Sequence, residues 1–457
     1  MKKGQSTLIL LGVLVILFTA VYFFEIKGGE KREQNRKLAS QLFQTEKDSV
    51  NRLILSTANS HIVCEKKGAE WIITAPVFTQ GDAQNIESNL SSILSANIER
   101  KIVDSTADLN YFGLLEPRGQ VQVISQDGKH ITLMVGDENP TGTLVFVKYP
   151  EDQAVYTTNK SLWNYVDKRL YDLRDKKIMH FNVDDVRKIS LVSRSQGTVS
   201  LEKSAGKWRI TAPVTLPANE SEVKSLLNRL SSGRAKDFIA EEPTDLKKYG
   251  LAKPAIKINL EIGESLARTS FSVGDTASSA GGGFYAKEET RPPIFTIEKW
   301  TRDGLEKGAF DLQDKKVVGF DGENADRIIW KIANQEFTAT KIDSVNWMVV
   351  APETLQVDQS LMRSWLEDCR DLSVDELETY QPKSLMKYGL DSPRLRVTIF
   401  AQDKEICSVI IGKEVAEKYY FKTAGHPHVY RIKKSTFERI NKHPKDLTVK
   451  TVTAGSS

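Results

Sequence analysis

Cysteine is scarce in this chain. Only Cys64, Cys369 and Cys407 occur among its 457 residues, and no CxxC pair is present. An odd and small number of thiols excludes a disulfide framework. The absence of a CxxC pair excludes a zinc ribbon and a thioredoxin-like motif.

A large charge of one sign is also missing. The 64 Lys and Arg nearly balance the 60 Asp and Glu, which gives a formal net charge of +4. No dense basic stripe with interleaved aromatic residues is present, so nucleic acid is not an expected partner. The 40% of hydrophobic and 27% of charged residues are typical of packed domains. The length leaves room for about three of them.

Groups that would carry catalysis or hold a metal are likewise few. His426 and His428 form an i, i+2 pair without a nearby cysteine or carboxylate cluster, so we expect exposed loop histidines and no metal site. No Lys-Ser/Thr follows Gly281-Gly282-Gly283, which excludes a phosphate-binding loop and indicates a flexible hairpin. Asp137 and Asp275 follow a strand glycine, but no second acid recurs with them, so turn positions are favoured over acid–base roles. We therefore expect no enzyme activity and no cofactor.

One long apolar run is present, from Leu8 to Phe24. Its 17 uncharged residues are at the short end of the about 17–25 that span a bilayer as a helix. A cleaved signal peptide has a shorter apolar region and a small-residue cleavage site, and we therefore predict one uncleaved transmembrane helix. Lys2 and Lys3 favour an N-terminus inside and a body outside, although five Lys and Arg between residues 27 and 37 favour the opposite orientation.

The body contains three repeats. Successive landmark tryptophans, each at the start of a strand that ends in Ala-Pro, are 137 and 139 residues apart. Each is followed 42 residues later by the glycine of a Tyr-Gly-Leu or Tyr-Phe-Gly-Leu turn, then by a proline, and then by a glycine at the end of a strand. Landmarks in register three times predict a tandem repeat. They are Trp71, Pro76, Gly113, Pro117 and Gly136; Trp208, Pro213, Gly250, Pro254 and Gly274; Trp347, Pro352, Gly389, Pro393 and Gly412.

Each repeat predicts a mainly antiparallel module with one main helix. Alternating apolar residues and hairpin turns such as Asp127-Gly128 predict the strands. Asp82, Asn219 and Asp358 occupy equivalent helix N-cap positions. Behind each, apolar residues four and seven positions apart form one helical face: Ile86, Leu90 and Ile93; Val223, Leu227 and Leu230; Met362, Leu366 and Cys369. A short closing helix carries Trp163, Trp300 or Phe437.

The expected organisation is an α+β fold of three tandem modules behind one N-terminal transmembrane helix. The predicted segments are a cytoplasmic stub and anchor (1–24), a juxtamembrane segment (25–47), modules at 48–181, 182–319 and 320–447, and a polar tail (448–457).

Comparison between the repeats favours buried roles for the conspicuous side chains. The landmark tryptophans could form a surface on which a ligand stacks or could pack on the module core, and core packing is favoured. The three thiols fall mostly at positions that are apolar in the sister copies, which indicates inert core cysteines. Cys64 aligns with Leu201 and Thr340, Cys369 with Ile93 and Leu230, and Cys407 with Ile131.

The motifs W-x-I-x-x-P, Y-G-L-x-x-P and I/V-G-x, behind one N-terminal apolar segment, resemble a bacterial family catalogued as domain of unknown function 4340. The resemblance covers about residues 48–447. It implies, from the usual company of such proteins, association with ABC-type export systems of the gliding-motility kind. Lys413 stands where Asp137 and Asp275 do, so a function that needs this aspartate in every copy is not expected.

We therefore expect a membrane-anchored accessory or scaffold subunit with a single span in the bacterial inner membrane and an extracytoplasmic body. Its expected partner is a protein of an ABC-type transporter complex. The alternative is a cell-envelope adaptor that binds polysaccharide or another envelope polymer without a transporter, since repeated modules give avidity. Function is expected on surfaces where the three copies differ.

Overall fold

The computed structural model describes residues 40–103, 108–278 and 282–448. Within these ranges, no helix is long and apolar enough to cross a membrane. The predicted span at Leu8–Phe24 and residues 25–39 of the predicted juxtamembrane segment lie outside them. Two compact units divide the chain: one contains the residues up to Lys177 together with Arg234–Glu241, and the other contains Ile178–Gly233 and the residues from Glu242 onward.

Three antiparallel sheets of nine strands follow one another along the chain, which confirms an α+β fold of three tandem modules. The strand order is the same in each: β4-β3-β2-β1-β6-β7-β8-β9-β5, then β13-β12-β11-β10-β15-β16-β17-β18-β14, then β22-β21-β20-β19-β24-β25-β26-β27-β23. Chain neighbours pair along most of each sheet, and the strand that follows the main helix (β5, β14 or β23) lies at the far edge.

The first module begins with a 3-10 turn and ends with a one-turn helix. Its strands are β1 (Val50–Thr57), β2 (Ser60–Lys67), β3 (Glu70–Ala75), β4 (Thr79–Gln80), β5 (Arg100–Val103), β6 (Gly119–Ser125), β7 (His130–Glu138), β8 (Leu144–Lys148) and β9 (Val155–Asn159). Its helices are α3 (Ala83–Leu94), α4 (Ser161–Val166) and α5 (Leu170–Leu173), with 3-10 turns η2 (Lys47–Ser49) and η3 (Leu109–Phe112).

The second module repeats this order of elements. Its strands are β10 (Val186–Ser193), β11 (Gly197–Ser204), β12 (Lys207–Ala212), β13 (Leu216–Pro217), β14 (Asp237–Ala240), β15 (Ile256–Ile262), β16 (Ala267–Thr276), β17 (Phe284–Glu288) and β18 (Ile294–Ile297). Its helices are α6 (Glu220–Ser232), α7 (Lys299–Leu305) and α8 (Ala309–Leu312), with 3-10 turns η4 (Val183–Asp185) and η5 (Lys247–Tyr249).

The third module ends in a 3-10 turn in place of the one-turn helix. Its strands are β19 (Arg327–Ile332), β20 (Gln335–Lys341), β21 (Trp347–Ala351), β22 (Leu355–Gln356), β23 (Glu376–Thr379), β24 (Leu395–Ala401), β25 (Lys404–Val415), β26 (Lys418–Thr423) and β27 (Val429–Lys433). Its helices are α9 (Gln359–Arg370) and α10 (Lys434–Ile440), with 3-10 turns η6 (Met386–Tyr388) and η7 (Pro444–Leu447).

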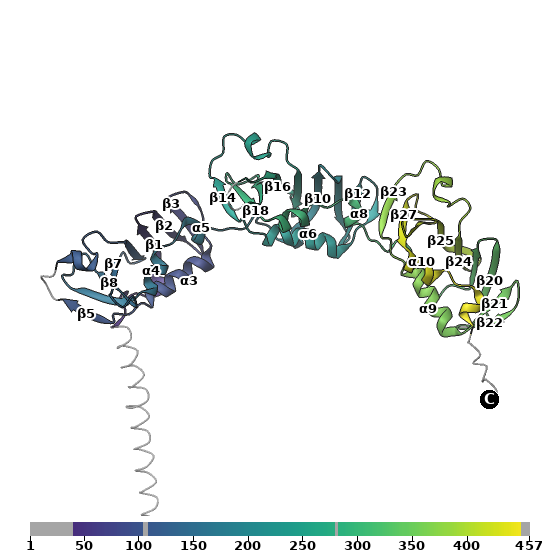
Figure 1. Ribbon diagram of the computed structural model, residues 1–457, viewed down its shortest axis with the longest axis horizontal. Coiled ribbons are helices and arrows are strands. Elements are labelled where there is room, and N and C mark those ends of the chain that lie inside the picture. The colour runs from purple at the N-terminus through teal and green to yellow at the C-terminus, as the bar shows by residue number, and fades with distance from the viewer. Residues whose placement is uncertain (1–39, 104–107, 279–281, 449–457) are drawn as a thin grey trace, which may run out of the picture. The chain divides into compact units, whose positions relative to one another are not determined.

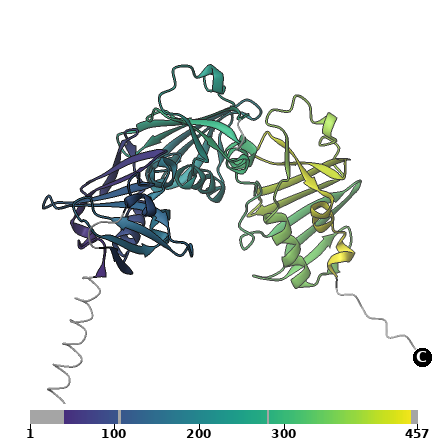
Figure 2. The same ribbon diagram turned by 60° about the vertical axis from the view of Figure 1, so that its left-hand side comes forward.

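Helices cover one face of each sheet and leave the other face open (Figures 1 and 2). In β15, Ile256, Ile258 and Leu260 are buried and alternate with partly exposed residues. Because successive side chains of a strand point to opposite faces, this alternation separates a covered apolar face from an open one. The helix α6 buries its apolar stripe of Val223, Leu226, Leu227 and Leu230 in the same module.

The predicted main helices and their caps are confirmed. The Asp82 side chain accepts from the backbone N–H of Asn85, and Asn219 and Asp358 each accept from two N–H groups of the first turn. These bonds satisfy donors that have no partner within the helix. All nine predicted stripe residues, including Cys369, are buried.

The Tyr-Gly-Leu turn sits directly on the strand glycine of its module. Gly113, Gly250 and Gly389 end η3, η5 and η6 with left-handed φ angles of 60°, 68° and 67°, which favour glycine. A Cβ atom at the strand glycine would lie 2.0–2.1 Å from the carbonyl oxygen of the turn, which is Phe112 O for Gly136, Tyr249 O for Gly274 and Tyr388 O for Gly412. The two glycine landmarks are therefore two sides of one close contact. Pro117, Pro254 and Pro393 lie two residues before the strands that follow.

The Ala-Pro landmarks contain cis peptide bonds. Pro76, Pro213 and Pro352 are all cis, at the end of β3, β12 and β21. The sequence predicted the end of each strand from the missing proline N–H but did not predict the isomer.

The predicted closing helices are confirmed, since α4 carries Trp163, α7 carries Trp300 and α10 carries Phe437. The last helical bond is accepted by the carbonyl of Trp163 in α4, of Arg302 in α7 and of Phe437 in α10. Trp300 therefore lies two positions before the residue equivalent to Trp163.

Arg174, which follows α5, is buried within the first unit. Its guanidinium carbon lies 3.4 Å from the centroid of the Phe238 ring, and its Nη1 lies 2.6 Å from the Glu241 carboxylate. The equivalent residue after α8 is Gln313, which is also buried but uncharged. The segment Arg234–Glu241 thus packs on the end of the first module.

We predict that Gly274→Ala destabilises the protein, because the added methyl group would collide with the Tyr249 carbonyl. Overpacking of this kind costs about 1–3 kcal/mol, and we expect a lower midpoint in thermal unfolding followed by circular dichroism. Gly319→Ala is the matched control, since nothing lies within 4 Å of its added Cβ atom. Equal midpoints for the two variants would contradict the proposed contact.

Candidate binding surface

The landmark tryptophans lie in the module cores. Trp71, Trp208 and Trp347 are 1%, 6% and 5% exposed, so packing on the core is confirmed for them and a stacking surface made of these rings is excluded. A lysine faces each across the hairpin, and in the first module the Trp71 indole N–H donates to Glu87.

The three cysteines are free and buried, as predicted. The structural partner of Cys64 in the third module is Ala339 and not Thr340, because Cys64 faces Ile73 and Ala339 faces the equivalent Val349. The third hairpin contains one residue more before its tryptophan, which shifts the alignment by one.

The histidines do not form a metal site in the part of the chain that the structure describes, where no group of three or more His, Cys, Asp or Glu could hold a metal ion. The prediction of an exposed pair is wrong for His428, which is buried and whose Nδ1 lies 2.7 Å from the Tyr380 carbonyl oxygen. Burial and the neighbouring His428 lower the pKa of His426.

Asp137 and Asp275 are exposed and lie against the turn glycines. A Cβ atom at Gly113 or Gly250 would come within 2.6 Å of the respective carboxylate. The acids therefore contact the Tyr-Gly-Leu turn rather than a second acid. Of the triple glycine, Gly282 and Gly283 follow β16 in the loop before β17, and Gly281 lies outside the described residues.

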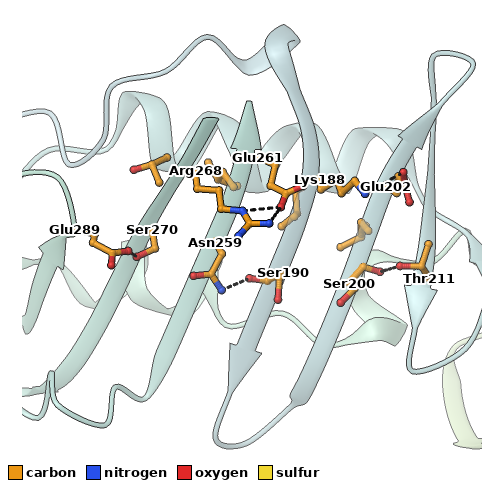
Figure 3. A pocket seen from close by; sticks show the side chains of 14 residues that line it. Lys188, Ser190, Ser200, Glu202, Thr211, Asn259, Glu261, Arg268, Ser270 and Glu289 are labelled. Carbon is orange, nitrogen blue, oxygen red and sulfur yellow. Dashed lines mark hydrogen bonds and ion pairs between the residues drawn. The ribbon is translucent and has the colours of Figure 1, made fainter. Parts of the chain in front are cut away.

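A hollow of about 610 Å³ lies on the open face of the second module. It lies over β10, β11, β15 and β16, and Figure 3 shows polar side chains rising from these neighbouring strands. Its size is within the range of ligand sites, but its lining is more polar than theirs. The lining includes Lys188, Ser190, Ser200, Glu202, Thr211, Asn259, Glu261, Arg268, Ser270 and Glu289.

The hollow exists because small residues occupy its floor. Ser190 faces Ser200 across the β10–β11 pair. The same pair is Ile54 and Val63 in the first module and Ile329 and Thr338 in the third.

A second difference adds a carboxylate to the rim. Glu261, opposite Lys188, replaces Ile124 of the first module and Phe400 of the third. The second module alone thus combines a small-residue floor with a charged rim.

Four of the five charged side chains that line the hollow are paired with one another near solvent. Lys188 Nζ lies 3.4 Å from Glu202, and Arg268 Nη2 lies 3.0 Å from Glu261. Exposed pairs of this kind contribute about 0–1 kcal/mol each. A charged partner can therefore replace either ion pair at little cost.

Hydrogen-bonding groups lie between these pairs. The Asn259 amide donates to the Ser190 carbonyl at 3.5 Å, the Thr211 hydroxyl donates to the Ser200 carbonyl at 3.3 Å, and the Ser270 hydroxyl donates to Glu289 (Figure 3). The arrangement suits recognition of a polar, charged segment. Sequence reasoning missed this surface, although the replacement of Ile54 and Ile329 by Ser190 was a usable signal.

Comparison with known proteins gives a family without an assigned activity. A family model described as "Domain of unknown function (DUF4340)" matches residues 71–207, 208–345 and 347–455. The three matches begin at the landmark tryptophans, which confirms the suspected resemblance. No curated protein sequence matches the chain.

We predict that the native thiols are unreactive at pH 8. Burial raises the pKa of Cys64 and of Cys407 to about 12, and also raises that of Cys369. Only about one thiol in ten thousand is then ionised at pH 8, and the thiolate is the nucleophile. Titration with a thiol-specific disulfide reagent should label no cysteine in the native chain and three after unfolding in guanidinium. Rapid labelling of the native protein would contradict the assignment of core thiols.

Proposed function

The chain belongs to the DUF4340 family, and from that premise we propose that it is a membrane-anchored, non-catalytic scaffold subunit that binds a protein partner on the open face of its second module. The observation that carries the proposal is the hollow over Ser190 and Ser200. The three modules have equivalent cores. The sister copies fold without the serine pair Ser190 and Ser200, so folding does not require this pair.

The lining of the hollow supports a protein partner. Two cations and three carboxylates line it together with hydroxyl and amide groups, and the weak ion pairs among them are exchangeable. A polar protein segment offers the same kinds of group in complementary order. The third carboxylate, Glu289, accepts a hydrogen bond from the Ser270 hydroxyl, so it too can exchange this neutral partner for a donor of the bound protein.

The family resemblance supplies the partner class. We propose that the partner is a component of an ABC-type export system, and that the body lies on the extracytoplasmic side of the inner membrane, held by the span at Leu8–Phe24. Anchoring supports such an assembly because tethering raises the effective concentration of a membrane-bound partner.

The alternative partner, an envelope polysaccharide, receives less support from the same surface. Among the described residues that line the hollow, none is aromatic. A sugar ring typically stacks on the face of an aromatic side chain, and the described lining of the hollow offers none. We therefore retain the protein partner as the proposal.

We predict that Ser190→Ile abolishes partner binding without unfolding the chain, because isoleucine occupies the equivalent position in both sister modules. Full-length chain with a photo-crosslinking benzophenone side chain in place of the exposed Thr211 would be irradiated in native membranes, and its adduct identified by mass spectrometry. We expect one adduct with a transporter component, reduced about tenfold or more by Ser190→Ile.

The matched control for this experiment is Ser56→Ile, the same replacement on the open face of the first module, where Ser56 bonds His61. It should leave the adduct unchanged. An adduct insensitive to Ser190→Ile would contradict the role of the hollow, and an adduct with a soluble cytoplasmic protein would contradict the transporter assignment.

We also predict the topology of the anchor. Alkaline phosphatase fused after Ser457 should be active, because the enzyme requires an oxidising compartment for its disulfides, and green fluorescent protein at the same point should be dark after export through the general secretion pathway. The reverse pattern would place the body in the cytoplasm.

A further inference from the structure

Trp300 is the exposed tryptophan of the second module. Its side chain is 64% exposed, whereas the landmark Trp208 of the same module is buried. Trp300 is the second residue of α7, which packs on α6 in the helix layer. Its ring therefore leaves a large apolar surface in water, with an indole N–H at one edge.

Arg229 of α6 lies beside this ring. Its guanidinium carbon is 5.6 Å from the centroid of the Trp300 ring, and its Nη1 donates to the Trp300 carbonyl oxygen at 3.3 Å. The side chain passes over Gly304, where a Cβ atom would lie 2.1 Å from Arg229 Nε. Any larger residue at Gly304 would displace the arginine from this position.

The combination is specific to the second module. Equivalent positions in the sister copies are those that coincide when the N-cap residues of the main helices and the last backbone hydrogen bond of each closing helix are aligned. In the third module, Asp368 and Arg439 occupy the places of Arg229 and Gly304 and form an ion pair at 3.1 Å. The residues equivalent to Trp300, Arg229 and Gly304, in that order, are Ser161, Ser92 and Tyr165 in the first module, and Ser435, Asp368 and Arg439 in the third.

The charge of Arg229 is left without a carboxylate partner among the described residues, where its interactions are those with Trp300. The neighbouring cations of α7 are already neutralised: Lys299 pairs with Asp303, and Arg302 pairs with Asp303 and Glu306. A free guanidinium thus stands next to an exposed indole. Trp and Arg are the residues most enriched in the centres of protein interfaces.

We propose that Trp300 and Arg229 form a second docking site, for a protein partner that presents an apolar pocket flanked by a carboxylate. The indole fills the pocket and the guanidinium pairs with the acid. The proposal rests on the scaffold function and extends it, because this site belongs to the helix layer and the hollow belongs to the open face. Lys299 and Arg302 already neutralise Asp303 and Glu306, so the unpaired charge of Arg229 attracts the partner's carboxylate.

The test places the photo-crosslinking benzophenone side chain at residue 300 of the full-length chain in native membranes. Adducts are identified by mass spectrometry, and the equivalent residue of the third module, Ser435, is the control position. We expect a protein adduct at residue 300 that is absent at residue 435, and a yield about tenfold lower when Arg229→Gln is present in the same chain.

A second variant distinguishes loss of partner binding from loss of folding. Trp300→Ala removes an exposed side chain, so the unfolding midpoint should not change, while retention of the partner on the purified full-length chain should fall about tenfold or more.

The outcomes separate this site from the proposed function. An adduct at residue 211 with none at residue 300, a lipid adduct only, or a yield at residue 300 unaffected by Arg229→Gln would overturn the second site and leave the scaffold function standing. Absence of protein adducts at both residues 211 and 300 would overturn both.

Discussion

Each module buries only one face of its sheet, and this one-sided burial decides where its sequence is constrained. The covered face carries the apolar alternation of strands such as β15 and the stripe of the main helix. The Tyr-Gly-Leu turn packs on the strand glycine of β7, β16 or β25, and this requires glycine there, since a Cβ atom at Gly136, Gly274 or Gly412 would lie about 2 Å from a carbonyl oxygen. The open face is free of these demands, so it can change from copy to copy.

The second module uses this freedom on both of its sides. Its open face has serine in place of the isoleucine of the sister copies and has gained Glu261 opposite Lys188. Its helix layer has exchanged the ion pair of the third module for Arg229 beside Trp300. Both changes expose groups suited to binding, and neither touches the core landmarks. In the proposed scaffold, one module therefore carries two recognition surfaces.

Comparing the three repeats in the sequence reveals the positions that they share, and these are the parts of the structure that could be predicted. Shared positions such as Trp71, Gly113 and Asp82 are visible because the core needs them three times, and the modules, helix caps and buried thiols followed from them. The cis bonds at Pro76, Pro213 and Pro352 were not predictable from composition. Thr340 was misaligned, because a one-residue change in hairpin length leaves the landmark spacing almost intact. The hollow depends on which small residues face each other across paired strands. Predicting it therefore requires the pairing register of the strands, which the sequence alone does not provide.

Binding at the hollow can be measured by carboxylate footprinting of the full-length chain in its native membrane against the same chain purified in detergent. A soluble carbodiimide and an amine would label exposed acids, and mass spectrometry would quantify each site. We expect that labelling of Glu202 and Glu289 in the hollow falls several-fold in the membrane, while the labelling of the open-face acids Glu65 of the first module and Glu405 of the third is unchanged. Equal labelling of all four acids in both states, or protection confined to Glu65 and Glu405, would contradict binding at the hollow.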